Sequence, residues 1–290
     1  MTTAPVVHRA TVLSPGDAAE VLALAAAAAE TDGVFPLDEH TVFGVRSNVP
    51  AAAVHLTVVT DFLAGYGQAD LSAGTGELVV HPAARGRGLG RALLDAALDA
   101  GARRFWAHGD HPAAAALAAA AGLTRDRVLW QFRRPLTDPL PDRPLPAGLT
   151  LRAFRPGQDD AAWLDLNARA FAGHPEQGRW TAADLAARMA EPWFDPAGFL
   201  LAVDAGGKLA GFHWTKVHPD GLGEVYVLGV DPAGHRAGLG SALTVAGLRH
   251  LAGLGLHTAL LYVDESNPAA VTLYRRLGFT THATDVMYTR

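Results

Sequence analysis

The sequence predicts an α/β fold, a mixed α+β sheet in two tandem domains. Three observations predict it: strand-like and helix-like segments alternate, one stretch of chain is repeated, and a proline-rich segment separates the copies. Residues 78–90 match residues 228–240 at an offset of 228 − 78 = 150. His111–Ala114 then matches Asn267–Ala270 at an offset of 267 − 111 = 156. Two matches in the same order indicate a duplicated domain, and 290 residues suffice for two cores.

The proline-rich segment marks the boundary between the copies. Residues 135–146 carry five prolines in twelve positions, and proline lacks the amide hydrogen that a helix or central strand needs. We expect a first domain over residues 1–136, a linker over 137–148 and a second domain over 149–290.

Hydrophobic periodicity and turn residues predict the elements of each domain. In the first half the expected strands are Val54–Thr60, Leu63–Gly67, Gly76–Val80, Phe105–Ala107 and Val128–Phe132, and the expected helices are Val21–Ala29, Leu89–Ala100 and Ala113–Ala121. In the second half the expected strands are Leu149–Phe154, Phe199–Val203, Leu209–Val217, Glu224–Val230, Thr258–Val263 and Val286–Thr289. The expected helices there are Asp159–Phe171, Thr181–Ala190 with Thr181 as N-cap, a helix that begins at Leu239, and Pro268–Leu277.

Composition excludes several classes of protein. A net charge of −5 does not favour nucleic-acid binding, which needs a basic surface. The longest apolar run, Val21–Ala29, is too short to span a bilayer, and no basic-then-apolar leader opens the sequence. The chain has no cysteine, which excludes disulfides and thiolate nucleophiles. We expect a cytoplasmic monomer that binds neither membrane nor nucleic acid.

A glycine-rich turn joins a strand to a helix in both copies. The first copy has Arg85–Gly90 and the second has His235–Gly240. Glycine lets the backbone approach an anion, and the start of the following helix offers free amide hydrogens and the positive end of its dipole. The Gly-Lys-Ser/Thr ending of a P-loop is missing. The repeated turn therefore predicts two phosphate-binding cradles.

The two copies resemble the GCN5-related N-acetyltransferases. In that family an Arg/Gln-x-x-Gly-x-Gly/Ala turn holds the pyrophosphate of acetyl-CoA, and an Asn, a Tyr-bearing helix and Leu-Gly-Phe follow. Arg85–Gly90 fits this turn, His235 departs from it, and Asn267, Tyr274 and Leu277–Phe279 fit the later part. The resemblance implies two tandem domains of this family that use acetyl-CoA and no metal. The implied acetyl-CoA contacts are Leu78, Val79, Val80, Gly86, Arg87, Gly88, Leu89, Gly90 and Arg91 in the first copy, and Leu228, Gly229, Val230, His235, Arg236, Ala237, Gly238, Leu239, Gly240, Ser241, Asn267, Pro268, Ala269, Ala270, Val271 and Thr272 in the second.

Longer polar and aromatic runs resemble the mycothiol synthases, a family of tandem acetyltransferases. These runs are Phe105–Gly109, Phe171–Gly178, Gly211–Pro219 and Gly223–Val230. The resemblance implies acetylation of the cysteinyl amine of cysteinyl-glucosaminyl-inositol, a small thiol pseudo-disaccharide, in the last step of mycothiol biosynthesis. It also implies a set of substrate-binding residues, with Asp38 as an alternative to the first: Glu39, Glu176, Lys216, Glu224 and Tyr262.

Amine acetylation needs a base for the ammonium, a donor to the thioester carbonyl and a proton for the departing thiolate. Glu224, in the strand before the second cradle, is the candidate base, acting directly or through water, and Tyr274 is the candidate acid. A backbone amide near Gly229 or Val230 is the expected carbonyl donor. The first copy has Gly74 and Ala118 in place of the base and acid, so we predict that it binds acetyl-CoA or CoA without turning it over.

Other interpretations stay open at this point. The acceptor could be an aminoglycoside or a protein N-terminus, or the chain could be a non-catalytic acyl-CoA sensor. His108 and His111 have a His-x-x-His spacing, but no third ligand is near in the sequence, and we expect no metal site. We expect His213, His218 and His250 to be surface or packing residues.

Overall fold

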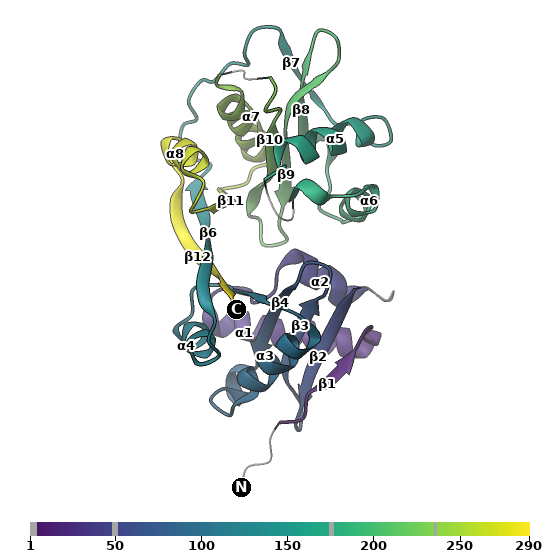
Figure 1. Cartoon of the computed structure of the whole chain (residues 1–290). Helices are drawn as coiled ribbons and strands as arrows, with labels where there is room; N and C mark the ends of the chain where they lie inside the picture. Colours follow the sequence, from purple (N-terminus) through teal and green to yellow (C-terminus); the bar gives the residue numbers. More distant parts are fainter. Residues whose placement is uncertain (1–4, 48–51, 174–176, 235–236) are drawn as a thin grey trace. The chain divides into compact units, whose positions relative to one another are not determined.

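The computed structural model describes residues 5–47, 52–173, 177–234 and 237–290. The chain forms two compact units, both visible in Figure 1. The first unit comprises Met1–Trp130, Asp264–Ser266 and Ala283–Arg290, and the second comprises Gln131–Val263 and Asn267–His282. Strands of mixed direction and helices build both units, so the expected α/β fold in two domains is confirmed.

The units do not simply follow one another along the chain. The sequence predicts a second domain that runs to residue 290, whereas the last strand, β12 (Thr280–Thr289), ends in the first unit. There Val286–Thr289 pair antiparallel with β5 (Arg104–Ala107). The chain enters the second unit within β6 (Thr124–Pro135), ahead of the linker expected at residues 137–148. Hydrophobic patterns predict strands but not strand partners, so the sequence alone does not reveal this exchange.

The first unit contains the elements of the first repeat. They are β1 (His8–Ala10), α1 (Pro15–Asp32), α2 (Glu39–Arg46), β2 (Ala53–Val59), β3 (Leu63–Asp70), β4 (Thr75–Val80), a 3₁₀ turn (Pro82–Ala84), α3 (Leu89–Ala100), β5 and α4 (Pro112–Ala120). Its strand order is β1-β2-β3-β4-β5-β12, with β4 and β5 parallel.

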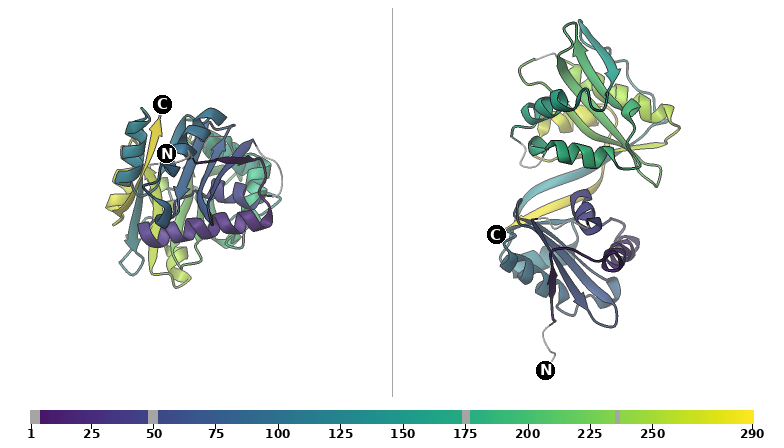
Figure 2. Two further views of the ribbon diagram at one scale, coloured as in Figure 1. Left: turned by 90° about the horizontal axis from the view of Figure 1, so that it is seen from below. Right: turned by 90° about the vertical axis from the view of Figure 1, so that its right-hand side faces the viewer.

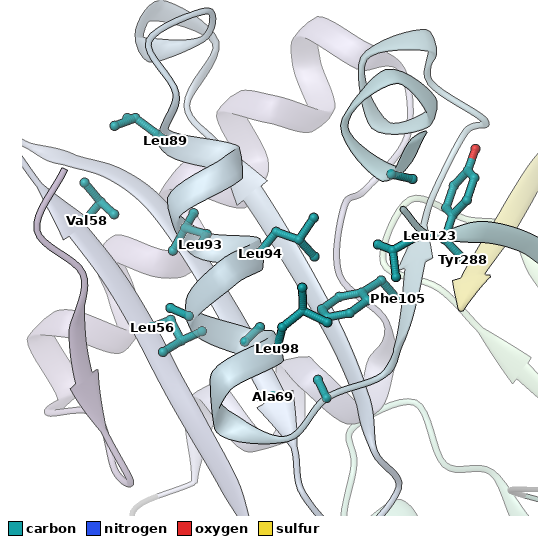
Figure 3. Close-up of a cluster of buried hydrophobic side chains, with 14 of the residues drawn as sticks. Leu56, Val58, Ala69, Leu89, Leu93, Leu94, Leu98, Phe105, Leu123 and Tyr288 are labelled. Atoms are coloured by element: carbon teal, nitrogen blue, oxygen red, sulfur yellow. The ribbon is translucent and has the colours of Figure 1, made fainter. Parts of the chain in front are cut away.

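Each face of this sheet has its own core, because side chains alternate along a strand. On one face, Leu93 of α3 packs in a cluster with Phe105 and with Tyr288 of β12 (Figure 3). Helices α1 and α2 lie on the other face (Figure 2, right), where their buried side chains form a cluster with Tyr66 and Val79. The burial of Tyr288 explains why the end of β12 belongs to this unit.

The second unit repeats the plan with longer connections. Its elements are β7 (Leu149–Ala153), α5 (Asp160–Ala170), a 3₁₀ turn (Gln177–Arg179), α6 (Ala182–Met189), a 3₁₀ turn (Pro196–Gly198), β8 (Phe199–Asp204), β9 (Leu209–Val217), β10 (Gly223–Val230), α7 (Leu239–Gly253), β11 (Thr258–Asp264) and α8 (Pro268–Arg276). Their strand order, starting from β6, is β6-β11-β10-β9-β8-β7. An aromatic cluster around Trp163 and Trp214 lies under α5 and α6, and α7 packs Leu239 and Leu243 on the sheet.

Helix caps explain where the sequence prediction succeeds and fails. Thr181 caps α6 as expected, since its hydroxyl accepts from the Asp184 amide. Helix α1 begins before the expected Val21, because Ser14 and Asp17 form a capping box. Helix α2 was not predicted: it is short, and its sequence signals are the N-cap Asp38, Glu39 in the first turn and Arg46 in the last. In the described ranges, no helix is both long and apolar enough to cross a membrane.

His213 is a fully buried histidine between β9 and α7. Its Nδ1 lies 2.8 Å from the Leu243 carbonyl oxygen, and its Nε2 has no hydrogen-bond partner among the described residues. A Cβ at Gly247 would lie 2.1 Å from the His213 ring, so only glycine fits there. Burial, with a smaller contribution from His250, lowers the pKa of His213 to about 4. The imidazole is therefore neutral in the folded protein.

Acid should destabilise the second unit through His213. An unfolded histidine has a pKa of about 6.5, so the unfolded chain binds more protons as the pH falls from 6.5 toward 4. We expect the free energy of unfolding to fall by about 3 kcal/mol over this window. Urea denaturation at several pH values measures this slope. The variant His213→Met does not titrate and should show a shallower slope, and equal slopes in the two proteins would refute the assignment.

Candidate active site

Both cradles have the same local geometry. Gly88 caps α3 with φ +81° and Gly238 caps α7 with φ +87°, in the left-handed region that favours glycine. Glycine has no side chain, so no side-chain hydrogen bond caps either helix. The first-turn amides therefore stay available to an anion. Equivalent leucines of the two repeats lie beside the two turns. A Cβ at Gly90 would lie 3.4 Å from Leu117, and one at Gly240 would lie 4.0 Å from Leu273.

Each unit also opens its sheet at the same place. Parallel pairing of β4 with β5 covers Thr75–Gly76 and Arg104–Phe105, and pairing of β10 with β11 covers Gly223–Glu224 and Ala259–Leu260. Beyond these pairs the two strands part. In the described chain, the edge of β10 beyond Glu224 therefore has no ladder partner on β11, which leaves main-chain groups for a ligand.

A cavity of about 370 Å³ lies where the strands of the first unit part. Its wall is mostly apolar and includes Ala118, the counterpart of Tyr274 in the repeat. Eight of the nine expected acetyl-CoA contacts of this copy line it, all but Arg87: Leu78, Val79, Val80, Gly86, Gly88, Leu89, Gly90 and Arg91.

Ion pairs at the wall of this cavity were not expected from the sequence. Both Arg85 guanidinium nitrogens donate to the Asp32 carboxylate, at 2.7 and 2.6 Å, and His111 lies 3.6 Å from the same carboxylate. The hydrogen bond from Arg85 outweighs burial and lowers the pKa of Asp32. Asp32 is the last residue of α1 and is far from Arg85 in the sequence. The last turn of α1 has no basic residue, and no local sequence pattern predicts the contact between Asp32 and the cradle.

In the second unit the candidate base is buried and has a partner. The Glu224 side chain is 8% exposed, and its Oε2 lies 2.7 Å from Nε2 of His218. Lys216 lies opposite Glu224 in the β9–β10 ladder, with its ammonium 4.7 Å from the centre of the Trp193 ring and 5.1 Å from that of Tyr226. His218 is thus neither a free surface residue nor a packing residue, contrary to expectation.

The candidate acid, Tyr274, lies in α8 and is 8% exposed. Its ring packs edge-on against Phe279, and burial raises the pKa of its hydroxyl to about 12. The phenol therefore holds its proton at neutral pH. Asn267 caps α8, because its side-chain oxygen accepts from the Ala270 amide at 3.1 Å.

The remaining expected contacts are distributed over four segments. Leu228, Gly229 and Val230 end β10, Ala237 precedes the Gly238 cap, Leu239, Gly240 and Ser241 begin α7, and Pro268–Thr272 begin α8. Tyr262 on β11 is 43% exposed, and its hydroxyl accepts from Gln131. Glu39 is the first residue of α2. Glu176, His235 and Arg236 lie outside the described residues.

The first unit holds a buried charged cluster that the sequence did not suggest. His108 lies 2.8 Å from Glu77 through Nε2 and 3.1 Å from Asp285 through Nδ1, and Glu77 also accepts from the Asp38 amide. Burial alone would lower the pKa of His108, but hydrogen bonds to Asp285 and Glu77 outweigh it and raise this pKa well above its usual value. Burial and the charge of Glu77 raise the pKa of Asp38 to about 7. His108 is held as a cation between carboxylates.

Comparison with known proteins agrees with this geometry. Residues 161–279 match the model of the acetyltransferase (GNAT) family, and residues 51–122 match an acetyltransferase (GNAT) domain. A mycothiol acetyltransferase of Salinispora arenicola is 59% identical over 98% of this chain and 96% of its own length. Another, of Thermobispora bispora, is 59% identical over 96% of this chain and 97% of its own length.

The fold recurs in solved structures. A tandem GNAT protein from the clavulanic acid biosynthesis pathway covers 98% of both chains with a TM-score of 0.73 and 22% identity, which shows a shared fold. The 59% identity to the two mycothiol acetyltransferases over nearly the full length of each chain is stronger evidence of relationship than a shared fold. On these grounds the chain belongs to the GNAT acetyltransferases and, within them, to the mycothiol acetyltransferase family.

Proposed function

We propose that this chain transfers the acetyl group of acetyl-CoA to the cysteinyl amine of cysteinyl-glucosaminyl-inositol, the last step of mycothiol biosynthesis. The observation that carries the proposal is the position of Glu224, a buried carboxylate at the point where β10 and β11 part. The names of the relatives support a role in mycothiol biosynthesis, and the acceptor is the one that the sequence resemblance implies. A cytoplasmic monomer that needs no metal stays a prediction of the sequence.

The second unit carries the chemistry in this proposal. Glu224 accepts a proton from the substrate ammonium, which frees the lone pair for attack on the thioester carbonyl. A main-chain amide of β10 near Gly229 or Val230 stabilises the carbonyl oxygen as it gains charge. When the carbon–sulfur bond breaks, Tyr274 gives its proton to the CoA thiolate, and the second proton that the attacking nitrogen loses as the amide forms restores the Tyr274 hydroxyl. Its raised pKa keeps that proton in place until the thiolate forms.

Two groups of residues bind the substrates. The turn before α7 and the start of α8 hold the phosphates and pantetheine of acetyl-CoA, as the free first-turn amides at Gly238 favour. Lys216, Tyr262, Glu39 and Glu176 bind the sugar and inositol hydroxyls. The ring centres of Trp193 and Tyr226 lie 4.7 and 5.1 Å from the Lys216 ammonium, and these cation–π contacts order this charged group for hydrogen bonding.

The first unit binds acetyl-CoA or CoA without turning it over. Its cavity and its Gly88 cap support binding, while Ala118 and Gly74 supply neither an acid nor a base. Both ring nitrogens of His108, a titratable residue in the wall of this cavity, are bound to carboxylates. Bound ligand would stabilise this unit by mass action.

A panel of amines tests the proposed reaction. We expect the purified protein to release CoA from acetyl-CoA with cysteinyl-glucosaminyl-inositol at a kcat/KM at least about 100-fold above that with an aminoglycoside or a peptide N-terminus, since unpaired polar groups reject poor acceptors. Preference for either of those amines would replace the acceptor. Binding of acetyl-CoA without transfer to any amine would favour a sensor.

Loss of the Tyr274 hydroxyl tests the candidate acid. Tyr274→Phe keeps the ring that packs on Phe279, so acetyl-CoA affinity should change little, whereas kcat should fall by about 10- to 1000-fold. Steady-state kinetics with both substrates separate the two effects. An unchanged kcat with a raised acetyl-CoA KM would make Tyr274 a packing residue.

A further inference from the structure

Three charged or titratable side chains lie on one face at the closed end of the β9–β10 hairpin. The ladder pairs Lys216 with Glu224 and Val217 with Gly223. Because side chains alternate, His218 lies on the face of Lys216 and diagonally opposite Glu224. The hairpin register thus brings a histidine to a glutamate six residues further along the chain.

The turn fixes the backbone of His218. Its amide donates to the Leu222 carbonyl at 2.8 Å, and its carbonyl accepts from the Gly221 amide at 2.9 Å. Gly221 has φ +81°, a conformation that an L side chain rarely adopts. Asp220 also braces the turn, because its carboxylate accepts from the Leu222 amide. The imidazole is therefore presented to Glu224 from a rigid support.

His218 connects a buried group with solvent. The Glu224 side chain is 8% exposed and that of His218 is 27% exposed, and 2.7 Å separates Glu224 Oε2 from His218 Nε2. In the described part of the chain, His218 is the one side chain that hydrogen-bonds Glu224. Among the described residues, the strands next to Glu224 also carry titratable groups: Lys216 on β9, Tyr226 on β10 with Arg188 of α6 bound to its hydroxyl, and Tyr262 on β11.

A buried base needs a route by which it loses the proton it has taken. In each turnover Glu224 receives one proton from the ammonium and must return to the carboxylate before the next acceptor reacts. A bound acceptor shields the carboxylate further from water. Nε2 of a neutral His218 that carries its proton on Nδ1 can take that proton from Glu224, and the imidazolium so formed donates its Nε2 proton in a hydrogen bond to the carboxylate. Release of one proton to water and exchange with water between the two ring nitrogens then return His218 to the form protonated on Nδ1. The sum is one proton moved from substrate ammonium to solvent, with Glu224 and His218 restored.

We propose that His218 is a positioning residue that holds the Glu224 carboxylate and carries its proton to solvent in each turnover. The proposal rests on the proposed function, with Glu224 as base. His218 lies in the Gly211–Pro219 run, and the acetyl-transfer mechanism above gives this residue no other role.

Two substitutions separate proton transfer from hydrogen bonding. His218→Ala removes both roles, and His218→Gln keeps a hydrogen-bond donor for Glu224 but cannot carry a proton. We expect both variants to lower kcat by about 10- to 100-fold, with the acetyl-CoA KM within about 3-fold of its original value. Added imidazole should restore the kcat of His218→Ala in a concentration-dependent way and should leave His218→Gln unrestored, since glutamine fills the space.

Controls distinguish this proposal from a general defect. His257→Ala alters an exposed histidine just before β11 and should leave kcat and its imidazole dependence unchanged. In a Glu224→Gln background, His218→Ala should cause no further loss, because the two residues act in series. Thermal unfolding of each variant checks that the second unit is folded.

The proposal is overturned by an unchanged kcat in His218→Ala, by full activity in His218→Gln, or by a loss that imidazole does not restore. If the original protein acetylates cysteinyl-glucosaminyl-inositol and Glu224→Gln is impaired, such a result removes the role of His218 alone. If the original protein does not acetylate that amine, the proposed function fails first.

Discussion

The parting of β10 from β11 directly after Glu224 is the constraint on which the active site depends. Main-chain polar groups in a sheet need partners, so a ladder that stops inside a sheet leaves groups that a ligand can bind. The same break places Glu224 at the last paired position, where strand burial fixes it. The position of the base and the unpaired amides of β10 therefore follow from one feature of strand pairing.

The duplicated domain shows which parts of this design are structural and which are chemical. Both units keep the left-handed glycine cap, the parted strands and the leucine behind the turn. The side chains differ: the second unit has a buried phenol at Tyr274, while the first has Ala118 in the wall of a cavity. The first unit does hold a histidine and a glutamate near its cavity, but His108 is fixed as a cation between Glu77 and Asp285. Because carboxylates occupy both ring nitrogens of His108, this residue stabilises the contact between β12 and the end of β5, and neither nitrogen is free to transfer a proton.

Much of this could be predicted from sequence, because glycine turns, strand periodicity and repeats are local signals. The caps at Gly88 and Gly238, the strand that carries Glu224 and the helix that carries Tyr274 were all predicted. Contacts that depend on pairing between distant segments were not predicted. The His218–Glu224 contact depends on the hairpin register, the Asp32–Arg85 pair on the packing of α1, and the place of Asp285 on the exchange of β12. Helix α2 has only eight residues, too few for its apolar positions to give a clear periodic signal.

In this mechanism the second unit alone performs the transfer, while the first unit keeps a binding site. Calorimetry of acetyl-CoA binding, combined with an acetylation assay, in the Glu224→Gln, Tyr274→Phe double variant separates these two roles. We expect background acetylation and two acetyl-CoA sites, one of which the added substitution Gly88→Glu removes, since a side chain there crowds the first cradle. Substantial acetylation by the double variant that Gly88→Glu abolishes would show instead that the first unit is a working enzyme.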